Sequence, residues 1–300
     1  MISIVLPTHN RSSSLKNVIE TILGQEPIDS ISFELLVVDN NSTDDTKDIV
    51  KNLAIRNNRI KYHFEKQRGR SCALNKGIIE AQGDILAIID DDDVPSRYWL
   101  SAIYKKFLCD AEIDVVLGWL VKFKEGDQLK DVYRSATYHP PRELLMGNGG
   151  NMAMRKNVFL KIGLFDHRIG VGSKFGGSAE DTDFIYRCMR NNIKVEHSKD
   201  IVVFYRQRNT NSKQLIQLKR DWYGVGFLWA KYTILIKDYY ALKRVYWHTC
   251  ENLYKSFFAR GETRKAALVK LIYLLRGFIF GVIFWPFQKN IYCNGVKIKC

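Results

Sequence analysis

The sequence predicts an α/β fold, in which a mostly parallel sheet with flanking helices precedes a basic, aromatic-rich helical extension. Short apolar runs alternate with helix-length amphipathic segments over the first two hundred residues, which is typical of βαβ units and a parallel sheet. Residues 201–300 hold 18 Lys or Arg against four Asp or Glu, and they carry 21 of the 37 aromatic residues. Since residues 1–200 hold 28 basic and 28 acidic side chains, the net charge of +14 arises in the last third.

The predicted elements follow from apolar patterning and from capping residues. Strands are expected at 2–6, 33–38, 60–64 and 85–89. Helices are expected at 12–23, from the Asn40–Asp44 turn to about Arg56, at 71–81, and from Pro95 onward. Residues 211–250 also have a helical pattern, and a helix begins at Glu180 with Phe184, Ile185, Cys188 and Met189 on its apolar face.

Several classes of protein are excluded. The six cysteines are scattered singly without a Cys-x-x-Cys pair, which argues against a zinc ribbon or a disulfide scaffold and suits a reducing compartment. Neither Gly-x-Gly-x-x-Gly nor Gly-x-x-x-x-Gly-Lys-Ser/Thr occurs, which argues against a dinucleotide-binding Rossmann site and a P-loop. Residues 1–7 have the pattern of a strand and not of a signal peptide.

Polar residues follow three of the predicted strands, at 7–11, 39–40 and 90–93. The carboxyl ends of parallel strands are where ligands bind in such sheets. In an extended segment Asp90 and Asp92 point the same way and Asp91 points oppositely. Paired carboxylates of this kind suit Mg²⁺ or Mn²⁺ beside a phosphate-bearing substrate. The alternatives are a solvated acidic loop and, for Asp93, a helix cap.

Six stretches carry a family resemblance in a fixed order. They are residues 3–11, 35–45, 68–77, 83–92, 149–155 and 180–184. Together they resemble the family-2 glycosyltransferases of the GT-A fold. The resemblance implies a nucleotide-diphospho-sugar transferase domain over 1–205, with a nucleotide-binding half at 1–110 and an acceptor-binding half at 111–205. The remaining residues 206–300 form the helical extension.

The resemblance also implies the roles of site residues. Pro7, Thr8 and Asn10 would line the nucleotide pocket, and Asp39 would contact the base or ribose. Arg70 would approach the base or the diphosphate. Asp90 and Asp91 belong to the same donor site, with Asp90 on the ribose side. Asp92 would hold Mn²⁺ or Mg²⁺, and a UDP-sugar is the expected donor.

The remaining site residues come from the later motifs. Gly149, Gly150 and Asn151 would floor the donor-sugar and acceptor pocket. Glu180 and Asp181 resemble the acidic pair that supplies the general base, and Asp181 is preferred because the second acid lies nearest the acceptor in that pattern. The glycine-rich loop at 170–178 is a candidate lid. Some relatives have a histidine on the strand after the acidic pair, whereas residues 203–206 have none and His197 comes earlier.

The activity implied is inverting sugar transfer to an acceptor hydroxyl, in cell-surface polysaccharide or lipid-linked glycan synthesis. The alternatives are a nucleotide-sugar- or nucleic-acid-binding module without turnover and a membrane scaffold. Basic and aromatic residues in the tail fit a membrane surface, a nucleic-acid site or a packed helical layer.

The tail bears on the expected location of the protein. The longest uncharged run in 266–287 and beyond is twelve residues, 277–288, whereas a span needs about 20. We therefore expect peripheral or monotopic attachment to an anionic membrane, at the cytoplasmic face of the inner or plasma membrane. The expected acceptor is a saccharide or a lipid-linked sugar, and no nucleic acid is expected to bind.

Overall fold

The computed structural model describes residues 1–26, 31–124, 127–128, 149–175, 177–206, 211–287, 292–293 and 296–297. The chain divides into two compact units, Met1–Gly163 with Phe184–Gln207, and Leu164–Asp183 with Arg208–Cys300. The division differs from the boundary expected at residue 205, because the segment Leu164–Asp183 groups with the C-terminal helices.

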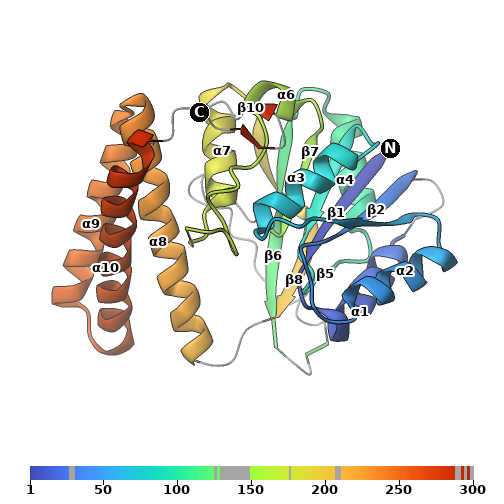
Figure 1. Cartoon of the computed structure of the whole chain (residues 1–300), viewed down its shortest axis with the longest axis horizontal. Coiled ribbons are helices and arrows are strands. Elements are labelled where there is room, and N and C mark those ends of the chain that lie inside the picture. Colours follow the sequence, from blue (N-terminus) through green and yellow to red (C-terminus); the bar gives the residue numbers. More distant parts are fainter. Residues whose placement is uncertain are drawn as a thin grey trace. The chain divides into compact units, whose positions relative to one another are not determined.

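An eight-stranded sheet forms the first unit (Figure 1), in the order β3-β2-β1-β4-β7-β6-β8-β5. Its strands are β1 Ile2–Thr8, β2 Phe33–Asp39, β3 Ile60–Phe64, β4 Ile85–Ile89, β5 Asp93–Pro95, β6 Val115–Phe123, β7 Asn151–Arg155 and β8 Val195–Arg206. The four strands predicted from the sequence form the parallel half, since β1 pairs in parallel with β2 and β4, and β2 with β3. The other half is mixed: β7 is antiparallel to β4 and β6, and β5 is antiparallel to β8.

Helices cover both faces of the parallel half. They are α1 Ser12–Leu23, α2 Thr46–Arg56 and α3 Arg70–Glu80. The same unit contains α4 Trp99–Cys109, which packs on β8, and the short helix α6 Val158–Ile162, while α7 Glu180–Arg190 crosses the division between the units. On one face Ile4 and Leu6 pack in one core with Ile19 and Trp99. On the other face α3 lies so close to β2 that a Cβ at Gly77 would be 3.2 Å from Val38. A sheet buried on both faces needs continuous apolar strands, which is the pattern that the sequence has.

The helix expected from Pro95 does not begin there. Residues Asp93–Pro95 form β5, in which Val94 lies opposite Phe204 of β8, and α4 begins at Trp99. Since β5 is the last strand in the order, Pro95 sits at an edge where a missing N–H costs little. Asp93 is therefore a strand residue, not a helix cap.

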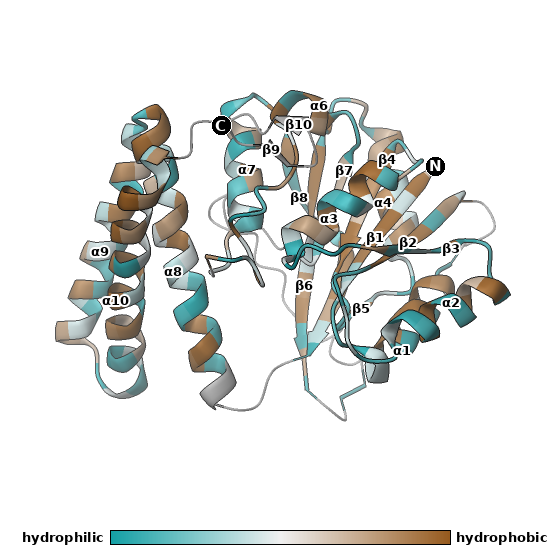
Figure 2. Ribbon diagram, viewed as in Figure 1, coloured by the Kyte–Doolittle hydropathy of each residue, from teal (hydrophilic) through white to brown (hydrophobic). Residues whose placement is uncertain are grey.

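The second unit is built mainly from three long helices, as the tail pattern predicted. They are α8 Asn211–Ile236, α9 Tyr239–Phe258 and α10 Gly261–Phe284, followed by the short helix η2 Trp285–Phe287 and the strands β9 Tyr292–Cys293 and β10 Val296–Lys297. Its interior is aromatic: Phe227 stacks on Trp285 with ring centroids 4.7 Å apart, and Trp285 Nε1 donates to the Phe227 carbonyl at 3.0 Å. Figure 2 shows hydrophobic residues along α9 and α10 as well as in the strands.

Candidate functional site

The carboxyl ends of β1, β2 and β4 bring the predicted donor residues together in the first unit. Thr8 ends β1 opposite Asp39, which ends β2, and the acidic run begins directly after β4. Pro7 and Thr8 are buried within β1. The parallel register thus places the nucleotide-pocket candidates at one edge of the sheet, as expected from the topology.

The acidic run after β4 forms a turn and not an extended segment. Thr8 Oγ1 donates to Asp91 Oδ2 at 2.8 Å. Arg11 reaches both Asp92, with Nη2 at 2.9 Å from Oδ2, and Asp91, with Nε at 3.3 Å from Oδ1. One guanidinium contacting both neighbours contradicts the expectation that Asp91 and Asp92 point to opposite sides, because alternation holds only for extended backbone.

Arg70 anchors the other side of the acidic turn. It is the first residue of α3, and its Nε and Nη2 donate to Asp90 Oδ1 at 2.9 and 2.7 Å. The same Nη2 donates to the Gly149 carbonyl at 2.7 Å. Arg70 therefore joins the two motifs that the sequence assigned to the donor site.

Gly150 leaves room for the carboxylates. A Cβ at this position would lie 2.7 Å from Asp93 Oδ2 and 2.8 Å from Asp90 Oδ2. Any side chain here would displace one of the two acids. The glycine therefore matters for the shape of the acidic turn, in addition to its place beside the expected sugar pocket.

The acidic turn concentrates negative charge. Burial, reinforced by the charges of Asp90 and Asp92, raises the pKa of Asp93 to about 9. Burial also raises the pKa of Asp91 to about 6, although Arg11 and Thr8 act in the opposite direction. Carboxyl groups that resist ionisation in this way favour a bound cation, which would supply the missing positive charge.

The residues fit a divalent cation held partly by substrate. The side chains of Asp90 and Asp92 are 34% and 37% exposed, so their oxygens are accessible from outside. Among the described residues, no three His, Cys, Asp or Glu side chains are arranged to hold a metal. Mg²⁺ and similar ions commonly take one or two carboxylates and complete their coordination with water and phosphate oxygens. A third protein ligand is not required by this chemistry.

Asp39 is held in place by its own neighbours. Its carboxylate accepts from the Ser42 backbone N–H at 2.9 Å and from the Tyr62 hydroxyl at 2.9 Å. Burial and this hydrogen bond raise the pKa of Tyr62 above its usual range, so its phenol stays a donor. Asn10, with φ of 53°, accepts from the Thr43 N–H at 2.8 Å and so joins the β1 loop to the β2 loop.

Asn151 has a different place from the one expected. Its side chain is fully buried: Oδ1 accepts from Trp99 Nε1 at 2.9 Å, and Nδ2 donates to the carbonyls of Trp119 and Ile201 at 3.1 and 2.9 Å. A buried amide with these partners connects strands. We therefore leave Asn151 out of the sugar pocket and keep Gly149 and Gly150. Residues 147 and 148, which directly precede Gly149, lie outside the described residues.

The acidic pair begins α7, as predicted. Glu180 is 5% exposed and its Oε2 accepts from the Ala179 N–H at 3.1 Å, whereas Asp181 is half-buried and its Oδ1 accepts from the Thr182 N–H at 2.7 Å. The predicted apolar face of α7 is buried at Phe184, Ile185 and Cys188. Its fourth member, Met189, is exposed. Met189 is the second-last residue of α7, which ends at Arg190.

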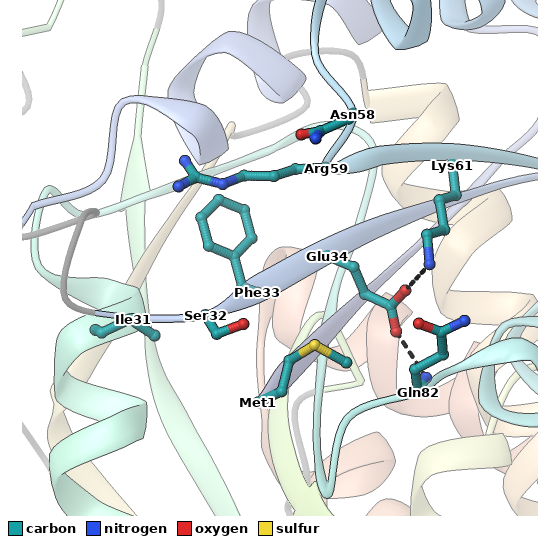
Figure 3. Close-up of a pocket in the computed structure, with 9 residues that line it drawn as sticks. All are labelled: Met1, Ile31, Ser32, Phe33, Glu34, Asn58, Arg59, Lys61 and Gln82. Atoms are coloured by element: carbon teal, nitrogen blue, oxygen red, sulfur yellow. Dashed lines mark hydrogen bonds and ion pairs between the residues drawn. The ribbon is translucent and has the colours of Figure 1, made fainter.

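A separate pocket lies at the opposite edge of the sheet (Figure 3). It has a volume of about 570 Å³ and is lined by residues at the beginnings of β1, β2 and β3, among them Met1, Phe33 and Lys61. Its buried Glu34 accepts from Lys61 Nζ at 2.6 Å and from the Gln82 N–H at 2.7 Å. Glu34 is thus neutralised by protein groups, and the predicted donor residues do not line this pocket.

Three residues that organise the candidate donor site were not predicted from the sequence. Arg11 links Asp91 and Asp92, Tyr62 holds Asp39, and Asn40 Oδ1 accepts from the Gly69 N–H at 2.8 Å just before Arg70. Arg11 and Asn40 stand in the polar strand-end clusters that were already singled out, so their position was a usable signal. Tyr62 lies in the third strand and carried no such signal.

Comparison with known proteins supports the same assignment. The profile of Glycosyl transferase family 2 matches residues 3–167. The GalNAc(5)-diNAcBac-PP-undecaprenol beta-1,3-glucosyltransferase of Campylobacter jejuni is 36% identical over 132 residues, 43% of this chain and 41% of the relative. Glycosyltransferase GlyG of Streptococcus pneumoniae is 30% identical over 128 residues, 42% of this chain and 41% of the relative. The chain thus spans about two fifths of the length of these two relatives.

Solved structures share the fold. Mannosyltransferase PcManGT from Pyrobaculum calidifontis, in complex with GDP-Man and Mn²⁺, superposes with a TM-score of 0.60 at 19% identity, covering 94% of this chain and 86% of that chain. S. aureus TarS in complex with UDP superposes with a TM-score of 0.53 at 14% identity, covering 99% of this chain and 96% of that chain. The predicted GT-A fold is therefore confirmed.

Proposed function

Because the chain belongs to glycosyl transferase family 2, we propose that it transfers a sugar from a nucleotide-diphosphate sugar to an acceptor hydroxyl, with inversion at the anomeric carbon. The observation that carries this proposal is the convergence of Thr8, Asp39, Arg70 and the acidic turn at one sheet edge. A donor with a negatively charged diphosphate needs cationic protein groups around it. It also needs a divalent cation that separates its phosphates from the carboxylates of the site.

The donor site divides into two parts. Asp39, oriented by Tyr62, contacts the base or ribose together with Pro7, Thr8 and Asn10. Arg70, already fixed by Asp90, approaches the diphosphate. Asp90 and Asp91 complete the site from the acidic turn. We propose UDP-sugars as the donors. GDP-sugars should be tested as well, because the two solved structures with the same fold contain UDP and GDP-Man.

Asp92 would hold Mn²⁺ or Mg²⁺, with the accessible Asp90 as a second carboxylate. Such an ion, when bound, neutralises the charge that develops on the leaving diphosphate. Arg11 keeps the Asp92 carboxylate oriented by its contact at 2.9 Å. The accessibility of the Asp90 and Asp92 carboxylates, which are 34% and 37% exposed, supports the assignment.

Asp181 removes the proton from the acceptor hydroxyl. A sugar hydroxyl is a weak nucleophile at neutral pH, and a positioned carboxylate contributes about 10²–10⁴ in rate. Glu180 is buried and accepts a hydrogen bond from its neighbouring N–H, while Asp181 is more exposed. That difference supports Asp181 as the base and leaves Glu180 a supporting role.

The composition of the tail supports the proposal that the enzyme binds a membrane surface. α10 with η2, Gly261–Phe287, is long and apolar enough to cross a membrane by length and composition, and 22% of its most apolar stretch is buried. Large apolar side chains of α9 and α10 are exposed, and Figure 2 shows these helices with hydrophobic residues along their length. Among these exposed side chains are Tyr246, Trp247, Tyr254, Phe257, Phe258, Ile272, Ile279 and Ile283, and Phe287 of η2 is exposed as well.

Cations accompany the apolar residues on these helices. Lys270 Nζ lies 5.1 Å from the Trp222 ring, and the Arg276 guanidinium lies 5.2 Å from the Tyr273 ring. An apolar surface with interspersed cations fits an anionic interface better than a hydrocarbon core. We propose peripheral or monotopic attachment at the cytoplasmic face, with a saccharide or lipid-linked acceptor for cell-surface glycan synthesis.

A donor and acceptor panel tests the proposal. UDP- and GDP-sugars are incubated with Mn²⁺ or Mg²⁺ and with free or lipid-linked saccharides, and both nucleoside diphosphate and glycoside are quantified. We expect equal amounts of the two products from one donor, and an inverted anomeric configuration by NMR. Tight donor binding without any glycoside would instead favour a binding module without turnover.

The base is tested by two single variants. Asp181→Asn should lower transfer at least about a hundredfold with nucleotide affinity nearly unchanged, because the base contacts the acceptor. Glu180→Gln should be milder. A larger loss in Glu180→Gln would move the base to Glu180, and a collapse of nucleotide binding in Asp181→Asn would place that residue in the donor site.

A further inference from the structure

Helix α8 holds the backbone just before the acidic pair. Gly224 of α8 lies directly against residues 177–178: a Cβ at Gly177 would be 2.8 Å from the Gly224 Cα, and a Cβ at Gly224 would collide with the Ser178 backbone carbonyl. The Ser178 hydroxyl also donates to Asp221 Oδ1 of α8. This backbone-to-backbone contact is possible only because position 224 has no side chain.

The same helix holds the turn just after the acidic pair. Lys231 Nζ of α8 donates to Asp183 Oδ1 at 2.7 Å, and the Tyr232 hydroxyl donates to the same oxygen at 2.8 Å. Lys231 also lies 3.0 Å from Asp166 Oδ2, which Arg168 contacts at 2.7 Å. Lys231, Asp183 and Asp166 are all fully buried. Carboxylates and cations without access to water depend on each other for charge neutralisation.

Between these two contacts the backbone is strained. Ala179 has φ of 125°, in a region that L-residues with a Cβ rarely adopt. Such a conformation persists only where surrounding contacts determine it, and strained residues cluster at functional sites. The strained residue directly precedes Glu180, so the contacts of α8 on either side account for its persistence.

The contact at Asp183 also fixes the rotation of the first turn of α7. Successive helix residues are separated by about 100°, so Asp181 projects about 200° from Asp183 and Glu180 projects only about 60° from it. Tying Asp183 to α8 therefore turns Glu180 inward and Asp181 away from α8. The observed burial agrees, since Glu180 is 5% exposed and Asp181 is half-buried.

We propose that α8 is part of the catalytic apparatus, in which Lys231 and Gly224 are positioning residues that orient the Asp181 carboxylate toward the acceptor. The inference rests on the proposed role of Asp181 as the general base. It assigns to a helix of the C-terminal extension a role in the chemical step, in addition to any role in attachment.

The test uses the full-length chain, a soluble acceptor and no vesicles. Lys231→Met should lower transfer per nucleotide-binding site at least tenfold, while the donor KM and the number of nucleotide sites per chain stay near those of the unmodified protein. A purely structural role would reduce binding sites and transfer in parallel, because unfolded chains lose both. Lys255→Met, which removes an exposed lysine of α9 paired with Glu251, should leave both quantities unchanged.

A second pair of variants decides the matter if Lys231→Met does not fold. Gly224→Ala displaces the Ser178 backbone, whereas Gly226→Ala, two residues along the same helix, collides with α10 at Leu274 and Phe278. We expect at least a tenfold loss of transfer per nucleotide site in Gly224→Ala and less than twofold in Gly226→Ala. The proposal would be overturned if the two variants transferred sugar at the same rate per nucleotide-binding site, whether that rate were high or low. If the unmodified protein transfers no sugar from any donor, the proposed function itself fails, which is a separate result.

Discussion

In the acidic turn after β4, Asp90, Asp91 and Asp92 contact two arginines, Asp90 and Asp92 remain partly accessible, and Asp93 is buried. In the second unit, by contrast, Asp166 and Asp183 are fully buried against Lys231. In the first group burial and like charges raise the pKa of Asp93 to about 9. In the second group burial opposes ionisation, yet Lys231 and Arg168 hold the pKa of Asp166 well below its usual range.

The contrast separates two uses of the same side chain. Negative charge that the protein leaves uncompensated costs folding free energy, and it fits a site whose ligand brings positive charge. Negative charge that buried cations neutralise orients backbone segments and needs no ligand. The first description fits the acidic turn, and the second fits the residues around the acidic pair.

The largest effect is expected at the acidic turn, where four aspartates lie beside two arginines. Asp92→Asn keeps the shape of the turn and removes one carboxylate, so transfer should fall at least about a thousandfold, in line with several kcal/mol of charge stabilisation. The melting temperature should not fall. The measurement is turnover across a Mn²⁺ titration, with Asp84→Asn as a control because that carboxylate is 95% exposed and lies at the opposite end of β4 from the turn. Full activity of Asp92→Asn in EDTA would contradict the metal assignment.

Substitution of the buried cation that neutralises Asp166 and Asp183 should lower the stability of the folded protein. Lys231→Met leaves buried carboxylates without their cation, so the free energy of unfolding should fall by about 3–5 kcal/mol. The exposed pair of Lys255 and Glu251 sets the scale for comparison, because Lys255→Met should cost under about 1 kcal/mol. Urea unfolding followed by far-UV circular dichroism measures both. Similar losses in the two variants would show that Lys231 is not a buried counter-ion.

Acid should also distinguish the two groups. The pKa of Asp166 is lowered in the folded state, so its stabilisation is present above the unfolded value of about 4 and is lost as the pH falls below it. The unmodified protein should lose about 1 kcal/mol more than Asp166→Asn between pH 4 and pH 3. The quantity to compare is the change in the free energy of unfolding with pH. The free energy itself is not compared, because Asp166→Asn also lowers it. Parallel slopes would contradict the ion pairing of Asp166.

The smallest effects concern exposed cations of the tail, which have no buried partner to neutralise. Each Lys or Arg near an anionic surface contributes about 1 kcal/mol, so Lys243→Gln and Arg264→Gln should each weaken binding to anionic vesicles about fivefold. Lys161→Gln on α6 of the first unit is the control. Sedimentation with vesicles at rising salt is the measurement. Because α10 packs on α8, point substitutions are preferable to deleting residues 262–300.

Much of the first unit could be predicted because its signals are local. Buried parallel strands are continuous apolar runs, and their polar ends sit next to them in sequence, so Asp39 and Asp90 could be placed at one edge before any coordinates. The geometry of the acidic turn could not be predicted in this way. Whether Asp91 and Asp92 share Arg11 depends on backbone angles in a turn, to which side-chain alternation does not apply.

The remaining misses come from contacts distant in sequence. Asn151 looked like part of a glycine-rich pocket loop, and only the packing of Trp99 and Ile201 around it showed a buried connector. The pair of Lys231 and Asp183 joins residues 48 positions apart in two different helices. No spacing or periodicity rule relates such positions, so the role of α8 needed coordinates.

The close packing of α8 on α10 bears on whether the two helices stay together when water is replaced by detergent or lipid. Gly226 lies against the Leu274 backbone, and Gly277 lies against the Tyr223 backbone. Contact of this kind relies on van der Waals attraction between backbones and not on the expulsion of water, as in helix pairs within lipid. The two helices should therefore keep the same spacing in water and in detergent or lipid. Purification in detergent would then preserve the pair as a unit, so the enzyme can be handled in micelles without separating α8 from α10.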